Sequence, residues 1–417
     1  MSYNNFLKNN NLIVKFIFLF LTFSLFLGFY LNENSTGGAE QDYLVHDQIS
    51  ELFFNDFNNT LQNYDSLKTR HSPIIPIYFS FLKFFNFDDN LVRFIHLPIS
   101  LLIVFIFFKC LEIKYSNYNR NNLIIFSSIL LLSPTIRSLS IWPDSHLYGL
   151  LFFLVATYFF LIFLKAKEKK KVKYALLNIL FLAISSYIRP SFSLFAIYFF
   201  WFFYKEFKFT KKLIQVIVFN LILALPAIYY LFYLDIMFLK TNAVSNIDFF
   251  TRINPANKIL LISSIVFFHI FPIIYFKFDH IKKKFFQIRL YEHVSLFLIF
   301  ILCLIYFNYK KDFSGGGIFF HISNLLNLEF IFFVISLISI YILYSLTRVN
   351  LNNFLIVILI FFSNPQLTIY HKYYDPLILI IFFLLINISL DKKIFNFKSI
   401  LFFYSHSFLF LLLSLLK

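Results

Sequence analysis

The chain has 417 residues, of which 59% are hydrophobic and only 14% are charged. Soluble proteins carry about 25% charged residues, so this composition excludes a large water-soluble protein. The net charge of +16 does not indicate nucleic acid as a partner, because the Lys residues gather in short segments between apolar runs, as topology signals of membrane proteins do.

The first apolar run, residues 12–31, predicts a membrane span that is retained rather than cleaved, because it has no clear small-residue cleavage site. The first loop, residues 33–90, follows it and is the longest mainly polar interval of the chain. It carries six carboxylates between Glu40 and Asp65. We expect this loop to lie outside the cytoplasm and to form part of an active site.

Residues 74–87 decide the topology of the rest of the chain. Their apolar run is interrupted by Pro76 and Lys83 and is shorter than the ~20 residues that a span requires. We therefore expect a helix that lies flat on the outer membrane surface. With this placement most basic clusters, such as residues 165–173, fall on the cytoplasmic side, as the positive-inside rule requires.

The predicted fold class is all-α: a polytopic helical membrane protein with about 13 (11–13) transmembrane helices. Several predicted spans are short, and the pair around Arg189-Pro190 is either two spans or a shallow hairpin. Residues 1–417 form one transmembrane domain, with no separate soluble domain. After the first loop, the predicted spans are residues 91–111, 121–135, 146–164, 174–188, 190–204, 213–233, 258–276, 291–308, 328–347, 352–367, 376–390 and 399–416.

Within the first loop, Asp42 and His46 stand four residues apart and would share one face of a helix, with Glu40 or Asp47 nearby. A carboxylate at a membrane surface can act as a general base toward an acceptor hydroxyl. Asp42 and His46 could also bind a divalent cation. The alternative is that these carboxylates only keep an exposed loop soluble.

A second outer turn, residues 137–146, gathers Arg137, Trp142, Asp144 and His146 just before a predicted span. One interpretation of this concentration of polar and aromatic groups is a role in a site. The other is that Asp144 only caps the helix that begins there, where a carboxylate favours the helix dipole.

Two further groups of cations lie at predicted helix ends. Arg189, between two apolar runs, could bind the phosphate of a lipid carrier or could extend to the membrane surface. The second group is a cluster in a late outer segment. Its positively charged side chains could bind a phosphate, but aromatic side chains are also expected there as part of an interfacial belt. This late cluster consists of His371, Lys372, Tyr373 and Tyr374.

Gly315, Gly316 and Gly317 occur together in a predicted outer loop, which suggests a shaped loop, although exclusion of glycine from helices also explains their position. The chain has no Walker-type phosphate loop, no GxSxG, no zinc signature and no dinucleotide fingerprint. An ATP-driven pump and cytoplasmic nucleotide-sugar chemistry are therefore disfavoured, and we expect no nucleotide cofactor.

Four segments follow one another in an informative order. They are His71-Ser72-Pro73-Ile74, Asp89 to Phe94, Ser133 to Asp144, and Tyr187-Ile188-Arg189-Pro190. Together with the acidic first loop, this order resembles the membrane-embedded glycosyltransferases of the GT-C superfamily, most closely the protein O-mannosyltransferase and lipid A aminoarabinose-transferase branch. The Asp-Glu pair of that branch is absent, and Glu40-Gln41-Asp42 or Asp47-Gln48 stands in its place.

The resemblance implies transfer of a sugar from a polyprenyl-phosphate-linked donor to a glycan, lipid or protein acceptor. It places the protein among the lipids of the inner membrane, with a cytoplasmic N-terminus and a periplasmic active site. The position that matches the catalytic carboxylate of that branch is Asp42 in the first place and Asp47 in the second. Asp144 matches its second acidic residue. The residues expected to bind the donor phosphate are Arg189, His371 and Lys372, and those expected to bind the acceptor or substrate are Glu40, His46, His71, Arg137, Tyr373 and Tyr374.

Two competing functions are a transporter or lipid flippase, and a polymerase or ligase of lipid-linked polysaccharide. A transporter is expected to have charged residues near the middle of the membrane and inverted repeats. In this chain most charges lie at predicted helix ends, and no convincing repeat is visible. A polymerase or ligase normally depends on a large late outer loop, whereas the early loop is the larger one in this chain.

Overall fold

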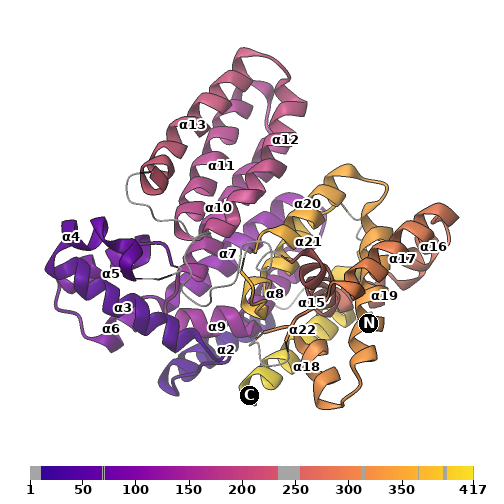
Figure 1. Ribbon diagram of the computed structural model, residues 1–417, viewed down its shortest axis with the longest axis horizontal. Helices are drawn as coiled ribbons and strands as arrows, with labels where there is room; N and C mark the ends of the chain where they lie inside the picture. The colour runs from indigo at the N-terminus through magenta and orange to yellow at the C-terminus, as the bar shows by residue number, and fades with distance from the viewer. Residues whose placement is uncertain are drawn as a thin grey trace. The chain divides into compact units, whose positions relative to one another are not determined.

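The computed structural model describes residues 11–67, 69, 71–232, 254–310, 315–364, 366–387 and 392–416. Within these ranges every element of secondary structure is a helix, which confirms the predicted all-α class. The chain divides into two compact units (Figure 1). Unit 1 comprises Met1–Asn246 with Tyr404–Lys417, and unit 2 comprises Ile247–Phe403.

Eight described helices are long and apolar enough to cross a membrane, and the count rises to ten if each of two bent helix pairs is one span. This is the architecture of a helical membrane protein. The bent pairs are α8 with η2 (Arg120–Leu132) followed by α9 (Pro134–Ile141), and α16 (Phe278–Phe285) followed by α17 (Leu290–Ile305). The eight are α2 (Asn11–Tyr30), α6 with α7 (Asp89–Lys114), α10 (Ser145–Lys165), α11 (Glu168–Ile188), α13 (Lys211–Phe232), α15 (Pro255–Phe276), α19 (Glu329–Thr347) and α22 (Phe397–Leu415).

The predicted count of thirteen spans is not confirmed, because some predicted spans contain only short helices. Helix α20 (Leu351–Phe362) has 12 residues and α21 (Leu377–Leu384) has 8. At 1.5 Å per residue these helices are roughly 18 and 12 Å long, well short of a hydrocarbon core of about 30 Å. Helix α12 (Phe195–Phe207), in the predicted span 190–204, has 13 residues.

The first loop is mostly helical. It contains α3 (Ala39–Asn55), α4 (Phe57–Gln62), η1 (Tyr64–Leu67) and α5 (Ile74–Lys83), which lie close together in Figure 1. Helix α5 has 10 residues, as expected for a segment too short to span. Helix α3 packs along α5 with a buried face in which side chains recur every three or four residues, the helical period. That face consists of Ala39, Tyr43, His46, Ile49, Ser50 and Phe53.

Helices α10 to α13 form a bundle in unit 1 (Figure 1). Small polar side chains join α10 and α11 at close approach: Asn178 donates to the Ala156 carbonyl at 2.8 Å, and Ser185 donates to the Gly149 carbonyl at 2.7 Å. Such bonds between helices satisfy polar groups that lipid cannot. Because α10 begins where α11 ends, the bundle presents residues 144–149 and 185–192 at the same end.

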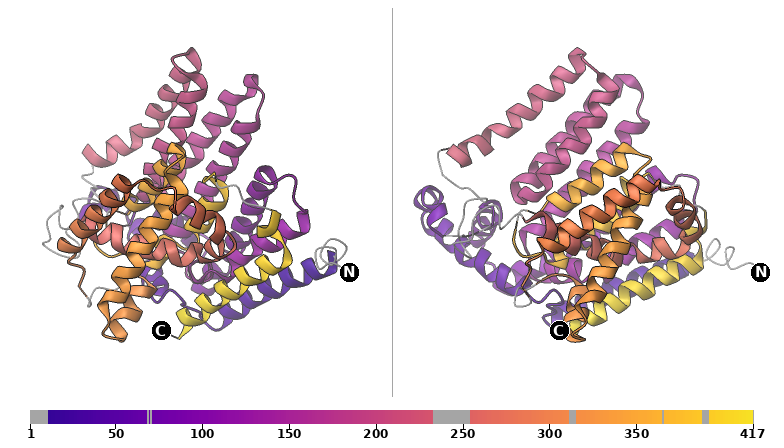
Figure 2. Two further views of the ribbon diagram at one scale, coloured as in Figure 1. Left: turned by 90° about the vertical axis from the view of Figure 1, so that its right-hand side faces the viewer. Right: turned by 45° about the vertical axis from the view of Figure 1, so that its right-hand side comes forward.

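The C-terminal part of α22 belongs to unit 1, where it runs beside α2 (Figure 2). The Tyr404 hydroxyl makes a 2.6 Å hydrogen bond with Ser128 Oγ and donates to the Ile125 carbonyl at 2.9 Å. The last helix is thus fastened to α8 (Arg120–Ser128), an element almost 300 residues earlier in the chain.

Unit 2 is built around α15, which packs against α19, α17, α20 and α21. Ser336 of α19 donates to the Leu260 carbonyl of α15 at 3.0 Å. Short helix α18 (Ile318–Leu325) follows the three glycines and packs on α19 and α15.

Candidate functional site

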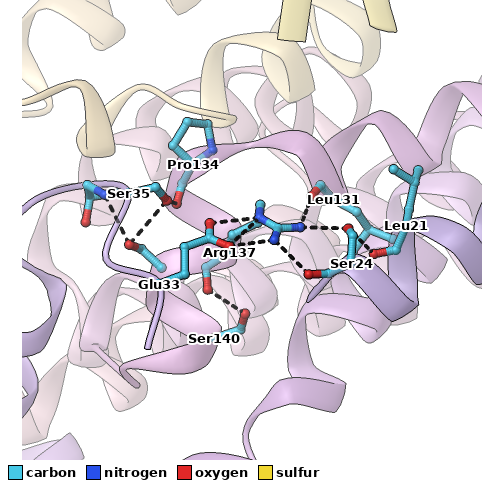
Figure 3. Close-up of polar contacts among 10 residues, drawn as sticks. Leu21, Ser24, Glu33, Ser35, Leu131, Pro134, Arg137 and Ser140 are labelled. Atoms are coloured by element: carbon cyan, nitrogen blue, oxygen red, sulfur yellow. Dashed lines mark hydrogen bonds and ion pairs between the residues drawn. The ribbon is translucent and has the colours of Figure 1, made fainter. Parts of the chain in front are cut away.

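A buried ion pair fastens the start of the first loop to the scaffold (Figure 3). Arg137 of α9 donates through Nε to Glu33 Oε1 at 2.8 Å and through Nη2 to Glu33 Oε2 at 2.5 Å, and both side chains are 6% exposed. Nη1 donates to Ser24 Oγ at 3.0 Å and Nη2 to the Ser24 carbonyl at 2.9 Å. These contacts engage all three nitrogens of Arg137 within the protein, and its predicted role in binding an acceptor stays a prediction. The pair anchors the first loop.

A second arginine links the first loop to α9. Arg93 of α6 (Asp89–Phe94) is buried and donates through Nε to the Ile141 carbonyl at 3.0 Å. Its guanidinium carbon lies 3.5 Å from the centroid of the Trp142 ring, a cation–π geometry. Tyr43 of α3 donates a 2.5 Å hydrogen bond to Asp89 Oδ1. Burial, reinforced by this carboxylate, raises the pKa of Tyr43, so that its hydroxyl stays protonated and keeps donating.

Three segments far apart in sequence meet at one point, where they form the His46–His71–Asp144 cluster. His46 Nε2 lies 3.1 Å from Asp144 Oδ1, and the His46 and His71 ring centroids are 4.5 Å apart. One ligand atom from each of the three residues lies within 4.8 Å of the others. His46 is 0% exposed and Asp144 1%, while the His71 side chain is 17% exposed. The cluster is thus almost sealed from water, with His71 on its open side.

Local structure explains how each member reaches this point. His46 belongs to the buried face of α3. His71 lies in the non-helical segment before α5, whose neighbour Ser72 donates to the Tyr187 carbonyl at the end of α11 at 2.5 Å. Asp144 occupies the N-cap position of α10, yet its side chain makes no capping hydrogen bond; it accepts instead from Ser145 Oγ at 2.8 Å and contacts His46. The interpretation of Asp144 as only a cap therefore lacks the bond that a cap would make.

The two carboxylates proposed as alternative bases have different surroundings. Asp42 Oδ1 lies 3.8 Å from His71 Nε2, beside the cluster. Asp47 Oδ1 lies 2.8 Å from Lys83 Nζ of α5, which also approaches Glu51 Oε1 at 3.5 Å. Lys83, which interrupts the apolar run of α5, thus pairs that helix with α3. Asp42 is the one of the two that faces the cluster.

The predicted acceptor residue Glu40 is half-buried in the first turn of α3. His146 is buried in the first turn of α10, where its ring stacks on Phe192 with 6.1 Å between the ring centroids. Arg189 follows α11 directly and is half-buried. A Cβ on Gly149 would lie 2.8 Å from Arg189 Cβ, so only glycine lets this turn approach α10 so closely. Arg189 therefore lies at the end of the bundle that carries Asp144 and the Ser72–Tyr187 bond.

In unit 2, the glycine loop and the late cluster come together. Gly315, Gly316 and Gly317 have φ of 97°, 94° and 89°, the left-handed region that favours glycine, as the shaped-loop interpretation requires. The Gly316 N–H donates to the Ile369 carbonyl at 2.8 Å, and the Ile318 N–H donates to His371 Nε2 at 2.9 Å. An imidazole nitrogen accepts a hydrogen bond only when it carries no proton.

His371 is consequently neutral in this arrangement, with Nδ1 3.4 Å from His269 Nε2, and it positions the glycine loop rather than offering a positive charge to a phosphate. Lys372 Nζ lies 5.9 Å above the Tyr370 ring, and Tyr373 packs edge-on against the same ring. Tyr374 is 1% exposed, and burial raises its pKa, so it contributes to the core of the unit more than to an accessible surface.

Sequence reasoning missed Lys258. It is 3% exposed in the first turn of α15 and donates to the Asn364 carbonyl of the segment that leads to the late cluster. In the sequence, Lys258 stands at the start of an apolar run, where a lysine is expected simply as the polar end of a membrane helix.

No protein-family model, no curated protein and no solved structure matches this chain.

Proposed function

We propose that this chain is an integral membrane glycosyltransferase of the inner membrane, which transfers a sugar from a polyprenyl-phosphate-linked donor to a glycan, lipid or protein acceptor on the periplasmic face. The observation that carries the proposal is the meeting of Asp42, His46, His71 and Asp144 at the end of the α10–α11 hairpin. A general base, imidazoles and a buried carboxylate are thereby concentrated where membrane helices end, within reach of a lipid-anchored substrate.

Asp42 is proposed as the general base that takes the proton of the acceptor hydroxyl. Its side chain is 27% exposed, which leaves it accessible to an acceptor, and it borders the cluster through His71. Asp47 is a weaker candidate, because its carboxylate is already paired with the Lys83 ammonium at 2.8 Å. Proton transfer by a positioned carboxylate typically contributes about 10²–10⁴-fold to a rate.

Arg189 is proposed to stabilise the phosphate that leaves when the glycosidic bond breaks. The position of Arg189 supports this role, because Arg189 lies at the same end of the bundle as Asp144 and close in sequence to the Ser72–Tyr187 hydrogen bond. Lys372 is kept as a further candidate for the phosphate, whereas the neutral state of His371 makes it a poorer one.

The exposed face of the first loop fits a membrane surface. Phe81, Phe84 and Phe85, at the end of α5, are 56%, 68% and 54% exposed, beside exposed Phe54 and Phe57. Aromatic side chains favour the boundary between lipid headgroups and acyl chains, where a short helix lies flat. The same placement puts the first loop on the periplasmic side and most basic clusters on the cytoplasmic side.

A transfer assay tests the proposal. Purified protein in nanodiscs is incubated with a panel of labelled polyprenyl-phosphate sugars and membrane-extract acceptors, and both donor consumption and labelled product are followed. We expect turnover by the wild type and by the Asp65→Asn control, an exposed carboxylate of η1 in the first loop. Asp42→Asn should retain donor binding and lose turnover. Absence of turnover with every donor, or equal rates for Asp42→Asn and Asp65→Asn, would overturn the proposal.

A further inference from the structure

The donor set of the His46–His71–Asp144 cluster is itself informative. Two imidazoles and one carboxylate are the ligands that three-ligand zinc and other divalent transition-metal sites use, with one position left for water or substrate. Mg²⁺ and Ca²⁺ prefer an all-oxygen shell, so two imidazoles disfavour them. The sequence pointed to Asp42 with His46 as a cation pair, but His46 Nε2 faces Asp144 rather than Asp42.

The distances suit a metal ion after a small adjustment. With metal–ligand bonds of about 2.0–2.1 Å, tetrahedral ligand atoms lie roughly 3.3 Å apart. The contact between His46 Nε2 and Asp144 Oδ1 measures 3.1 Å, and the whole set lies within 4.8 Å. The widest separation therefore needs to close by roughly 1.5 Å. His71 can supply this movement, since it lies in a non-helical segment outside α3 and α10.

A second observation comes from His46 alone. Its side chain is 0% exposed, and its Nδ1 has no hydrogen-bond partner among the described residues of the chain. A fully buried imidazole with one unsatisfied nitrogen is unusual and costs free energy. A metal–imidazole bond would form through Nε2, the nitrogen that faces Asp144. It would leave Nδ1 without a partner, and its gain would come from neutralising the buried Asp144 carboxylate.

We propose that His46, His71 and Asp144 bind one divalent transition-metal ion, zinc in the first instance, with the fourth position open toward Asp42. Asp42 Oδ1 lies 3.8 Å from His71 Nε2, which is close enough for it to accept a hydrogen bond from a water or hydroxyl bound at that position. The ion draws the first loop, the segment before α5 and the start of α10 into one centre. This proposal stands independently of sugar transfer, because it concerns occupancy of the cluster.

Metal analysis of the purified full-length chain tests it. The protein is isolated through a tag without histidine, loaded with Zn²⁺, Co²⁺, Mn²⁺ or Fe²⁺ in turn, freed of excess ion and analysed by inductively coupled plasma mass spectrometry. We expect about one ion per chain for the wild type and at least a tenfold weaker affinity for His71→Gln, since even loss of an outer partner of a metal ligand costs about 10–100-fold. His293→Gln, a half-buried histidine of unit 2, serves as the matched control and should keep the ion.

The Co²⁺ form adds a structural readout, because its visible absorption reports coordination by nitrogen and oxygen ligands. His71→Gln is the main variant, since His71 is partly exposed and its replacement leaves α3 and α10 unchanged, whereas Asp144→Asn alters a buried group. Wild-type protein that binds none of the four ions, or His71→Gln that binds as tightly as His293→Gln, would overturn the proposal. Failure of sugar transfer with one ion bound would count against the proposed function alone.

Discussion

Replacement of Gly28 by alanine should break the anchor of the first loop. Gly28 belongs to α2, and a Cβ at this position would lie 2.9 Å from Arg137 Nη2 and closer still to the Glu33 carboxylate. Real Cβ atoms essentially never approach another atom within 3.0 Å, so the buried ends of the Glu33 and Arg137 side chains must shift, which disturbs their ion pair. Figure 3 shows the Glu33 carboxylate and the Arg137 guanidinium facing each other, with Ser24 of α2 beside them.

The expected loss can be derived from the bonds involved. Arg137 donates to Glu33 through both Nε and Nη2, and hydrogen bonds to charged groups contribute about 1.5–3 kcal/mol each. Both side chains are 6% exposed, so little water replaces what is lost. We expect the free energy of unfolding to fall by about 3 kcal/mol. The sign is diagnostic, since Gly→Ala inside a helix normally stabilises by roughly 0.5–1 kcal/mol.

Unfolding of the protein in mixed micelles by increasing SDS, followed by the fluorescence of Trp142 and Trp201 and by circular dichroism, measures this loss. Gly38→Ala is the matched control, because a Cβ on Gly38 meets nothing within 4 Å and its φ is −144°. Equal unfolding midpoints for Gly28→Ala and Gly38→Ala would refute the argument. Glu33→Gln combined with Gly28→Ala should cost less than the sum of the two single changes, because both act on one pair.

Three further substitutions each test one other contact of the structure. Lys83→Met should lower the free energy of unfolding by at most about 1 kcal/mol in the same titration, because the pair with Asp47 is partly exposed; a loss above about 3 kcal/mol would contradict this. Ser72→Ala should cost about 1 kcal/mol and weaken Co²⁺ binding, by releasing His71 from the end of α11, and unchanged Co²⁺ affinity would argue against that coupling. Gly315→Ala should cost about 1–3 kcal/mol, because φ is 97° and the new Cβ would lie 2.6 Å from a carbonyl oxygen; a neutral result would contradict the strain.

The apolar periodicity of the sequence was sufficient to predict the helical class and the short helix α5. Runs of apolar residues report helices directly, and Pro76 with Lys83 marked a segment too short to span. The number of membrane spans was harder to predict from the sequence. Segments such as 376–390 are as apolar as a span, yet α21 has only 8 helical residues, because apolar composition does not determine where a helix ends.

The candidate site shows the same limit more sharply. His46, His71 and Asp144 were each noted as polar residues in outer segments, but their meeting depends on how α3 and α5 fold against α10, which no local pattern encodes. Arg137 lies 104 residues from its partner Glu33, so a charge that looked available for substrate is used internally. Long-range pairing of charges is decided by tertiary packing.

The central claim is that Asp42, beside the His46–His71–Asp144 cluster, is the base for sugar transfer. Its most direct test is the rate of transfer at saturating donor by Asp42→Asn and by Asp47→Asn, measured side by side on protein with matched folding. The account predicts a loss on the order of 10²–10⁴-fold for Asp42→Asn and less than about tenfold for Asp47→Asn. Comparable rates for the two variants, or a greater loss for Asp47→Asn, would contradict it.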